Sequence, residues 1–119
     1  MQDHIDIEAL DEAAAAVVLR LAGLDTPVII ESIRLLKLDR EFYVQVRSTD
    51  GAEGLAFTNG RARYLHPILN QKIIPYFIGK DARGLEQLLI GVYRHSSNYK
   101  LSGQALWCPV AWVEFAILD

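Results

Sequence analysis

The residue types that most often carry chemistry, histidine and cysteine, are few and widely spaced in this chain. Its three histidines, His4, His66 and His95, lie far apart, and none has a second ligand at the spacing of a zinc site. The single cysteine, Cys108, forms no CxxC pair and no disulfide framework, and its apolar neighbours indicate a packing residue. The sequence therefore predicts no zinc site and no redox pair.

The charge and hydropathy of the chain argue against two classes of partner. The formal net charge is -3 at pH 7 and no basic residues run together, so we expect no nucleic-acid partner. The apolar residues 13–19 follow two acids and end at Arg20. They are too short for a membrane span, which takes about 20 residues, and do not form a signal peptide. We expect no membrane partner and a soluble protein, with the cytoplasm slightly favoured over other compartments.

The first half of the chain has the pattern of a small sheet. Residues 42–48 alternate apolar and polar side chains, which predicts a strand with one buried face. Asp50-Gly51 then supplies a strong hairpin signal. With residues 28–38 before it and residues 52–57 after it, the strand predicts a three-stranded antiparallel meander. Within its last strand, Gly54 indicates a bulge or a close approach of two backbones.

Helical spacing replaces alternation in the second half. A helix is predicted from Ala62, with Pro67 in its first turn and Pro75 at its end. A second helix spans residues 82–94 behind an Asp81 N-cap, and a third follows a Ser102 N-cap. A meander followed by three helices, without βαβ units, predicts one α+β domain, and 119 residues allow only one.

The tail at residues 105–118 is apolar except for Pro109 and Glu114. Read as a helix, it is hydrophobic on every side and has to be buried all round. Pro109 places a helix start or a kink nearby, and Glu114 is expected to reach solvent or to pair with a base. The helix ends at Asp119 without a glycine cap or a basic last turn. We therefore expect this tail to be covered by a second copy of the chain, through Leu106, Val110, Val113, Phe115 and Leu118.

Three segments in combination resemble the N-terminal capping domain of the enolase superfamily, in particular the mandelate racemase and muconate lactonizing enzyme group. They read VQVRSTDGAEG at residues 44–54, GKDARGLE at residues 79–86 and VEFAILD at residues 113–119. The resemblance covers roughly residues 28–119. We interpret these as the capping domain, truncated before the barrel, and residues 1–27 as an N-terminal extension with a short helix.

The resemblance implies an activity for the parent protein. In that family the cap closes over the mouth of a (β/α)-barrel. The barrel enzyme is magnesium-dependent and abstracts a proton alpha to a carboxylate, giving racemisation or epimerisation, cycloisomerisation or acid-sugar dehydration. Mg2+ and the catalytic residues would lie in the missing barrel, so this chain would hold no catalytic residue and no metal, and would be inactive alone. The alternative is a self-contained α+β binding or dimerisation module, a homo-oligomer through the apolar tail helix.

The resemblance also implies two loops that shield and select a small carboxylate substrate. They correspond to the turn at residues 39–41 and to residues 58–63. The candidate contacts are Asp39, Arg40, Thr58, Asn59, Arg61 and Arg63. Because arginine can hold a carboxylate through two parallel hydrogen bonds and the first turn is short, the second loop is the stronger candidate. The alternatives are a solvated hairpin turn at residues 39–41 and a solvated first helical turn for the two later arginines.

Overall fold

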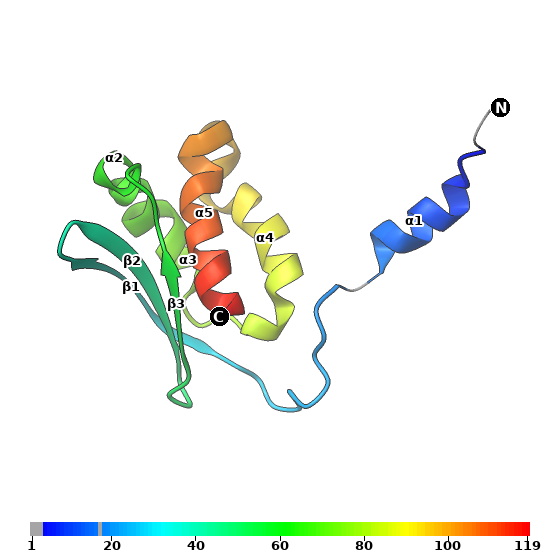
Figure 1. The fold of residues 1–119 in the computed structure, drawn as a ribbon, viewed down its shortest axis with the longest axis horizontal. Helices are drawn as coiled ribbons and strands as arrows, with labels where there is room; N and C mark the ends of the chain where they lie inside the picture. Colours follow the sequence, from blue (N-terminus) through cyan, green and yellow to red (C-terminus); the bar gives the residue numbers. More distant parts are fainter. Residues whose placement is uncertain (1–3, 17) are drawn as a thin grey trace.

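The computed structural model describes residues 4–16 and 18–119 and confirms the α+β fold class. Strands β1 (Ile30–Leu38), β2 (Glu41–Ser48) and β3 (Glu53–Phe57) form one antiparallel sheet in the order β1-β2-β3. The helices that follow lie together on one face of this sheet (Figure 1). The other face carries polar side chains, among them Arg34 and Gln45, which are joined by a hydrogen bond of 2.7 Å.

The period-2 pattern of β2 determines which face of the sheet is buried. Val44 and Val46 point inward and are 0% and 6% exposed, while Arg47 stays exposed and pairs with Glu53 on β3. Two tight turns connect the strands. Asp39 takes a positive φ of 56° in the two-residue turn between β1 and β2, and Gly51 takes 92° in the turn after β2, as short hairpins require.

The first predicted helix is interrupted, which corrects the sequence-based expectation for its two prolines. α2 (Ala62–Ile68) contains Pro67 in its second turn. A π-helical turn, η1 (Leu69–Ile73), follows, and α3 (Ile74–Phe77) begins with Pro75 in its first turn instead of ending there. Proline lacks an N–H group and clashes with the carbonyl four residues earlier. The wider π turn, in which Ile74 donates to the Leu69 carbonyl, accommodates that loss.

The second helix begins as the sequence predicts. Asp81 is the N-cap of a short 3-10 turn, η2 (Ala82–Gly84), that leads directly into α4 (Leu85–Arg94). Its carboxylate accepts hydrogen bonds from the Arg83 N–H at 3.0 Å and from the Val28 N–H at 3.1 Å. Asp81 therefore ties the start of the helix to the residues that enter β1. A second 3-10 segment, η3 (His95–Lys100), connects α4 to the tail.

The tail forms one long helix, α5 (Gly103–Leu118), with Pro109 inside it and Ser102 at its N-cap. It packs on β2 and β3 and against α2 and α4, so its own domain covers most of it. Leu106, Val110 and Val113 are at most 2% exposed, which removes them from the interface between copies that we expected from the sequence. The exposed large residues of α5 are Trp107, Phe115 and Leu118, at 43%, 57% and 51%, and Glu114 is half-buried.

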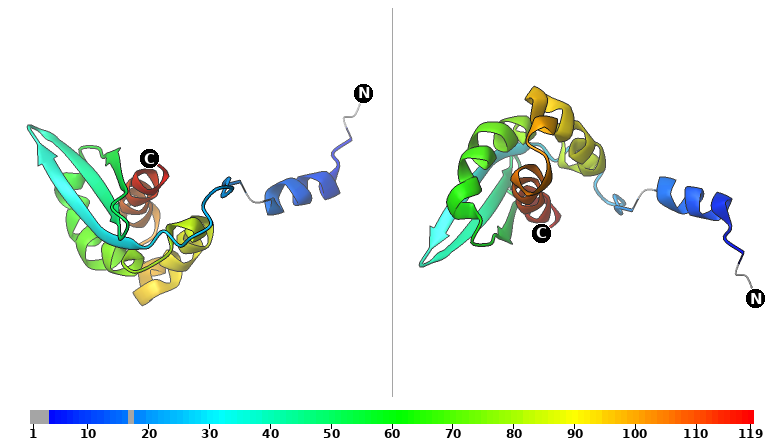
Figure 2. Two further views of the ribbon diagram at one scale, coloured as in Figure 1. Left: turned by 90° about the horizontal axis from the view of Figure 1, so that it is seen from below. Right: turned by 90° about the horizontal axis from the view of Figure 1, so that it is seen from above.

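The N-terminal helix α1 (Ile7–Ala15) stands apart from the sheet and the other helices (Figures 1 and 2). Asp6 caps it by accepting a hydrogen bond from the Ala9 N–H at 3.1 Å. None of its residues is buried. The molecule consequently measures 55 × 34 × 29 Å, with α1 at one end. Within the described residues, every helix is too short or too polar to reach across a bilayer.

Candidate loop pocket

The turn between β1 and β2 and the loop between β3 and α2 meet at one end of the sheet and enclose a pocket of about 250 Å³. We call it the loop pocket. It is lined by Arg40, Glu41, Phe42, Asn59, Gly60 and Arg63. The antiparallel meander places these residues together, because β1 ends, β2 begins and β3 ends at the same end of the sheet. Segments about twenty residues apart in the sequence thus form the pocket jointly.

Thr58 anchors the second loop to the first. Its hydroxyl donates to the Phe42 carbonyl at 2.8 Å, and its backbone N–H donates to the same oxygen at 3.0 Å. The side chain is 3% exposed. Through these two hydrogen bonds to β2, Thr58 holds the start of the second loop next to Phe42, which lines the pocket.

Asn59 shapes the loop that follows. Its side-chain oxygen accepts from the Arg61 N–H at 3.0 Å, and its backbone carbonyl accepts from the Ala62 N–H at 3.1 Å. These bonds turn the chain into the first turn of α2. The amide nitrogen of Asn59 also lies 3.6 Å from the sulfur of Cys108 on α5, so the start of α2 and α5 both contact this residue.

The structure brings together only some of the residues predicted for the site. Arg40, Asn59 and Arg63 line the loop pocket, whereas Asp39 and Arg61 are exposed and do not contribute to its lining. Thr58 lies beneath it. The sequence did not single out Glu41, Phe42 and Gly60 as contacts, although all three fall within or beside the two predicted loops. Cys108 carried no sequence signal, because its contact with Asn59 depends on how α5 packs.

The chemistry available in the loop pocket is that of anion binding. The lining includes two arginines, Arg40 and Arg63, and one glutamate, Glu41, so it carries one excess positive charge. Arginine binds carboxylates through two parallel hydrogen bonds, and the amide of Asn59 adds a neutral hydrogen-bonding group. A pocket that is open to solvent gains affinity when a second wall excludes water. The loop pocket is open to solvent and its arginines are exposed.

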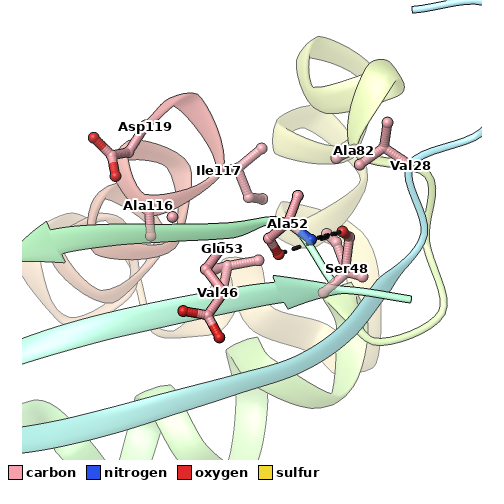
Figure 3. A pocket seen from close by; sticks show the side chains of 11 residues that line it. Val28, Val46, Ser48, Ala52, Glu53, Ala82, Ala116, Ile117 and Asp119 are labelled. Atoms are coloured by element: carbon pink, nitrogen blue, oxygen red, sulfur yellow. Dashed lines mark hydrogen bonds between the residues drawn. The ribbon is translucent and has the colours of Figure 1, made fainter. Parts of the chain in front are cut away.

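A second pocket, of about 190 Å³, lies at the opposite end of the sheet (Figure 3). Ser48 in its wall accepts from the Ala52 N–H at 3.1 Å and donates to the Asp50 carboxylate. These contacts lower the pKa of Asp50, first through the Ser48 hydroxyl and then through the Ala52 N–H. They stabilise the tight turn between β2 and β3, while Ala116 and Ile117 supply an apolar wall. The Ser48 hydroxyl in this pocket is therefore engaged in hydrogen bonds that stabilise the turn.

The residues that the structure describes do not fit a metal centre. Among residues 4–16 and 18–119, no group of three or more His, Cys, Asp or Glu side chains is placed to hold a metal ion. Magnesium prefers near-octahedral oxygen ligands, commonly with one or two carboxylates. Glu41 alone contributes a carboxylate to the loop pocket. We assign no metal-dependent step to these residues.

The comparisons with known proteins give different results for the sequence and for the structure. No protein-family model and no curated protein matches the sequence. Solved structures do match: a candidate racemase from Roseobacter denitrificans is 27% identical with a TM-score of 0.66, over 75% of this chain and 24% of that one. The 3,6-anhydro-D-galactonate cycloisomerase from Zobellia galactanivorans is 28% identical with a TM-score of 0.60, over 76% and 27%.

A third match concerns the fold alone. A mandelate racemase/muconate lactonizing protein from Paracoccus denitrificans, solved in complex with magnesium, is 15% identical with a TM-score of 0.58, over 77% of this chain and 26% of that one. The chain therefore spans about a quarter of the length of the solved structures that it matches.

Proposed function

We propose that this chain, which has the fold of the N-terminal domain of enolase-superfamily proteins of the mandelate racemase and muconate lactonizing enzyme group, acts as a substrate cap. In this proposal residues 28–119 form the cap and residues 1–27 an extension. The cap covers the mouth of a barrel and contributes to substrate selection. The observation that carries the proposal is the loop pocket, where Arg40 and Arg63 converge from two loops.

The substrate class follows from the pocket's charge. An excess positive charge and two exposed guanidinium groups suit a small carboxylate, with Asn59 available for a hydroxyl or carbonyl group. The corresponding reactions begin with removal of the proton alpha to that carboxylate, and lead to racemisation or epimerisation, cycloisomerisation or dehydration. In this proposal the acid–base residues belong to the barrel. Any magnesium ion would belong there too, because the described residues include no group of side chains placed to hold a metal.

In this division of labour the cap binds, orients and excludes water. Closing a pocket over a carboxylate removes competing water and strengthens each charge-assisted hydrogen bond. Thr58 and Asn59 hold the backbone of the second loop close to the first, so that the two loops present both arginines to a ligand at one end of the sheet. Orientation of this kind lowers the barrier of a reaction that another domain performs.

Carboxylate binding by the isolated chain tests the proposal. We would titrate 15N-labelled protein with gluconate, lactate and mandelate, and expect amide shifts at Asn59, Gly60 and Arg63 at millimolar concentrations. Arg40→Ala and Arg63→Ala should abolish these shifts. Arg47→Ala is the matched control, because it removes the same charge from an arginine that pairs with Glu53 at the other end of the sheet. Equal loss in all three variants, or shifts spread over the surface, would count against a site.

The absence of turnover is the second part of the test. In D2O the 119-residue chain should exchange no alpha proton of these carboxylates, with or without magnesium. Measurable exchange, traced by proton NMR of the substrate, would contradict the assignment of catalysis to a barrel.

A self-contained α+β binding or dimerisation module is the second candidate function. The observation that favours it is the exposure of apolar side chains on α5, where Phe115 and Leu118 are 57% and 51% exposed. We propose that the chain forms a homo-oligomer in which the exposed residues of this helix take part. Sedimentation velocity of the unaltered chain and, separately, of a Phe115→Asp variant measures how much these residues contribute to the oligomer.

A further inference from the structure

The helix α1 presents an apolar stripe to solvent. Ile7, Leu10 and Ala14 recur at three- and four-residue steps, which places them on one face of the helix. Ile7 is 68% exposed and Leu10 is 58% exposed. A helix of 9 residues is only marginally stable in water without a packing partner. The stripe therefore requires an apolar surface to cover it.

The domain offers such a surface on α4 and α5, which we call the aromatic patch. It consists of Leu89, Ile90, Tyr93 and Trp107, which line an open, almost wholly apolar hollow of about 400 Å³. The rings of Tyr93 and Trp107 stack with centroids 5.8 Å apart and planes inclined by 6°. Ile90 is 58% exposed, and both aromatic side chains are 43% exposed. The hollow has aliphatic and aromatic walls, and no described residue covers it.

Charge matches the two surfaces to each other. Residues 4–16, which include α1, contain the acids Asp6, Glu8, Asp11 and Glu12 and no lysine or arginine. Residues 87–107, which carry the aromatic patch, contain Arg94 and Lys100 and no acid, and Glu86, one turn before Leu89 and Ile90, accepts a hydrogen bond from the Val18 N–H. An acidic helix approaching this patch is attracted before the apolar contact forms, whereas two patches or two copies of α1 repel each other.

We propose that α1 of one chain packs into the aromatic patch of a second copy, and that the second copy returns its own α1 to the first. At 1.5 Å per residue, α1 is about 13 Å long, enough to lie along the α4 face that carries Leu89, Ile90 and Tyr93. Ile7 and Leu10 enter the hollow beside Trp107, and the acids of α1 meet Arg94 and Lys100.

The path of the chain favours a second copy over the same chain. The Val18 N–H donates to the Glu86 carboxylate at 3.1 Å, which fixes the base of the arm at the first turn of α4. From there α1 extends away from the domain (Figures 1 and 2). A closed, two-fold exchange of such arms buries two stripes and two patches at once. This inference does not depend on the carboxylate site. That site is formed by the β1–β2 turn and the β3–α2 loop, whereas the aromatic patch lies on α4 and α5.

Oligomeric state under single substitutions is the first test. By sedimentation velocity the unaltered chain should be a dimer. Leu10→Asp and Ile90→Asp should each weaken the dimer at least about tenfold, since each buries a carboxylate in the exchanged contact. Leu38→Asp is the matched control: Leu38 is 56% exposed at the end of β1 and should leave the dimer intact. Circular dichroism confirms that each variant folds. A monomeric unaltered chain, or equal effects of all three substitutions, would overturn the proposal.

Disulfide trapping identifies the arrangement within the dimer. In a Cys108→Ser background, Leu10→Cys and Ile90→Cys variants are mixed and oxidised. The exchange predicts a covalent dimer from the mixture, and little from either variant alone. A double variant that yields a cross-linked monomer would show that α1 folds onto its own chain and would overturn the exchange. Leu10→Asp should retain the carboxylate-induced shifts at Asn59, so failure of the exchange and failure of the carboxylate site are seen separately.

Discussion

Gly54 in β3 lies directly against Ala116 in α5. A Cβ atom built on Gly54 would stand 1.8 Å from the Ala116 carbonyl oxygen, far inside any contact distance. The close approach lets α5 settle on β3, and the Leu55 N–H at the sheet edge donates to the Asp119 carboxylate at 3.0 Å. Glycine at position 54 is thus required by the packing of the helix on the sheet.

Gly54→Ala should destabilise the domain. Because the obstructing atom is backbone, the helix has to shift, and overpacking of this kind costs about 1–3 kcal/mol. Gly84→Ala is the control, since nothing lies within 4 Å of a Cβ at that position. It should leave stability unchanged or raise it by up to about 1 kcal/mol. Urea denaturation midpoints with unchanged slopes measure both effects. Equal midpoints would show that α5 does not sit on β3 as described.

Asp81→Ala should lower the free energy of unfolding by about 0.5–2 kcal/mol, the usual cost of losing an N-cap. The loss also leaves the Val28 N–H without its acceptor. Asp81→Asn retains a capping oxygen and should cost less, although it breaks the pair in which Arg83 Nη2 lies 2.8 Å from the carboxylate. Thermal unfolding of the two variants compares the stability contributed by the N-cap with that contributed by the ion pair. An equal loss in the two variants would make the ion pair, and not the cap, the main contribution.

The same carboxylate predicts a dependence on pH. Hydrogen bonds from Arg83, and then the Arg83 and Val28 N–H groups, lower the pKa of Asp81 to about 2. In an unfolded chain an aspartate titrates at about 3.9. The folded pKa is the lower one, so this stabilisation is fully present above about pH 4 and is lost as the pH falls toward 2. The stability difference between the unaltered chain and Asp81→Asn should shrink over that interval. A difference that is constant from pH 6 to pH 2 would contradict it.

The parts of the fold predicted from sequence are those where local pattern and tertiary structure agree. Alternation in residues 42–48, Asp50-Gly51 and the Asp81 N-cap each act within a few residues, and each is found in the structure. Pro67 and Pro75 were misplaced within their helices, because a π turn between them is chosen by packing and leaves no pattern in the sequence. The tail was predicted to need a partner copy, but a helix that is apolar all round does not reveal what covers it.

The loop pocket was predictable only in part, for the same reason. The two loops came from a family resemblance, which names segments but not the side chains that converge. Arg40 and Arg63 line the same pocket because β3 ends at the end of the sheet where β2 begins. Arg61, two residues away, follows the helical turn to the outside. To predict which of Arg61 and Arg63 lines the pocket, one has to know where α2 begins relative to the sheet, and the sequence does not give this position.

Asn98→Ala should destabilise the junction between η3 and the π turn. Asn98 is 1% exposed, and its amide nitrogen donates to the carbonyls of Val92 at 2.9 Å and Lys72 at 3.3 Å. Removing it takes this donor from one buried and one part-buried carbonyl oxygen, at a cost of about 1–3 kcal/mol. Ser96→Ala changes an exposed neighbour and should have little effect. Chemical denaturation of both variants provides the comparison, and equal midpoints would rule out a structural role for the amide.

Thr58→Val separates a structural role from substrate contact at the loop pocket. The substitution preserves shape and removes the hydroxyl that donates to the Phe42 carbonyl at 2.8 Å. Phe42 keeps the Thr58 N–H as a donor, so the expected loss of stability is modest, about 1 kcal/mol. Carboxylate affinity, read from the Asn59 and Gly60 amide shifts, should change by less than about twofold, the equivalent of 0.4 kcal/mol.

Arg63→Ala should behave in the opposite way, because Arg63 is exposed and lines the pocket. It should abolish carboxylate binding and leave the denaturation midpoint unchanged, as exposed charges contribute little to stability. If Thr58→Val abolished binding at unchanged stability, the hydroxyl would be a ligand contact and the buried bond to Phe42 would have to open when a carboxylate binds.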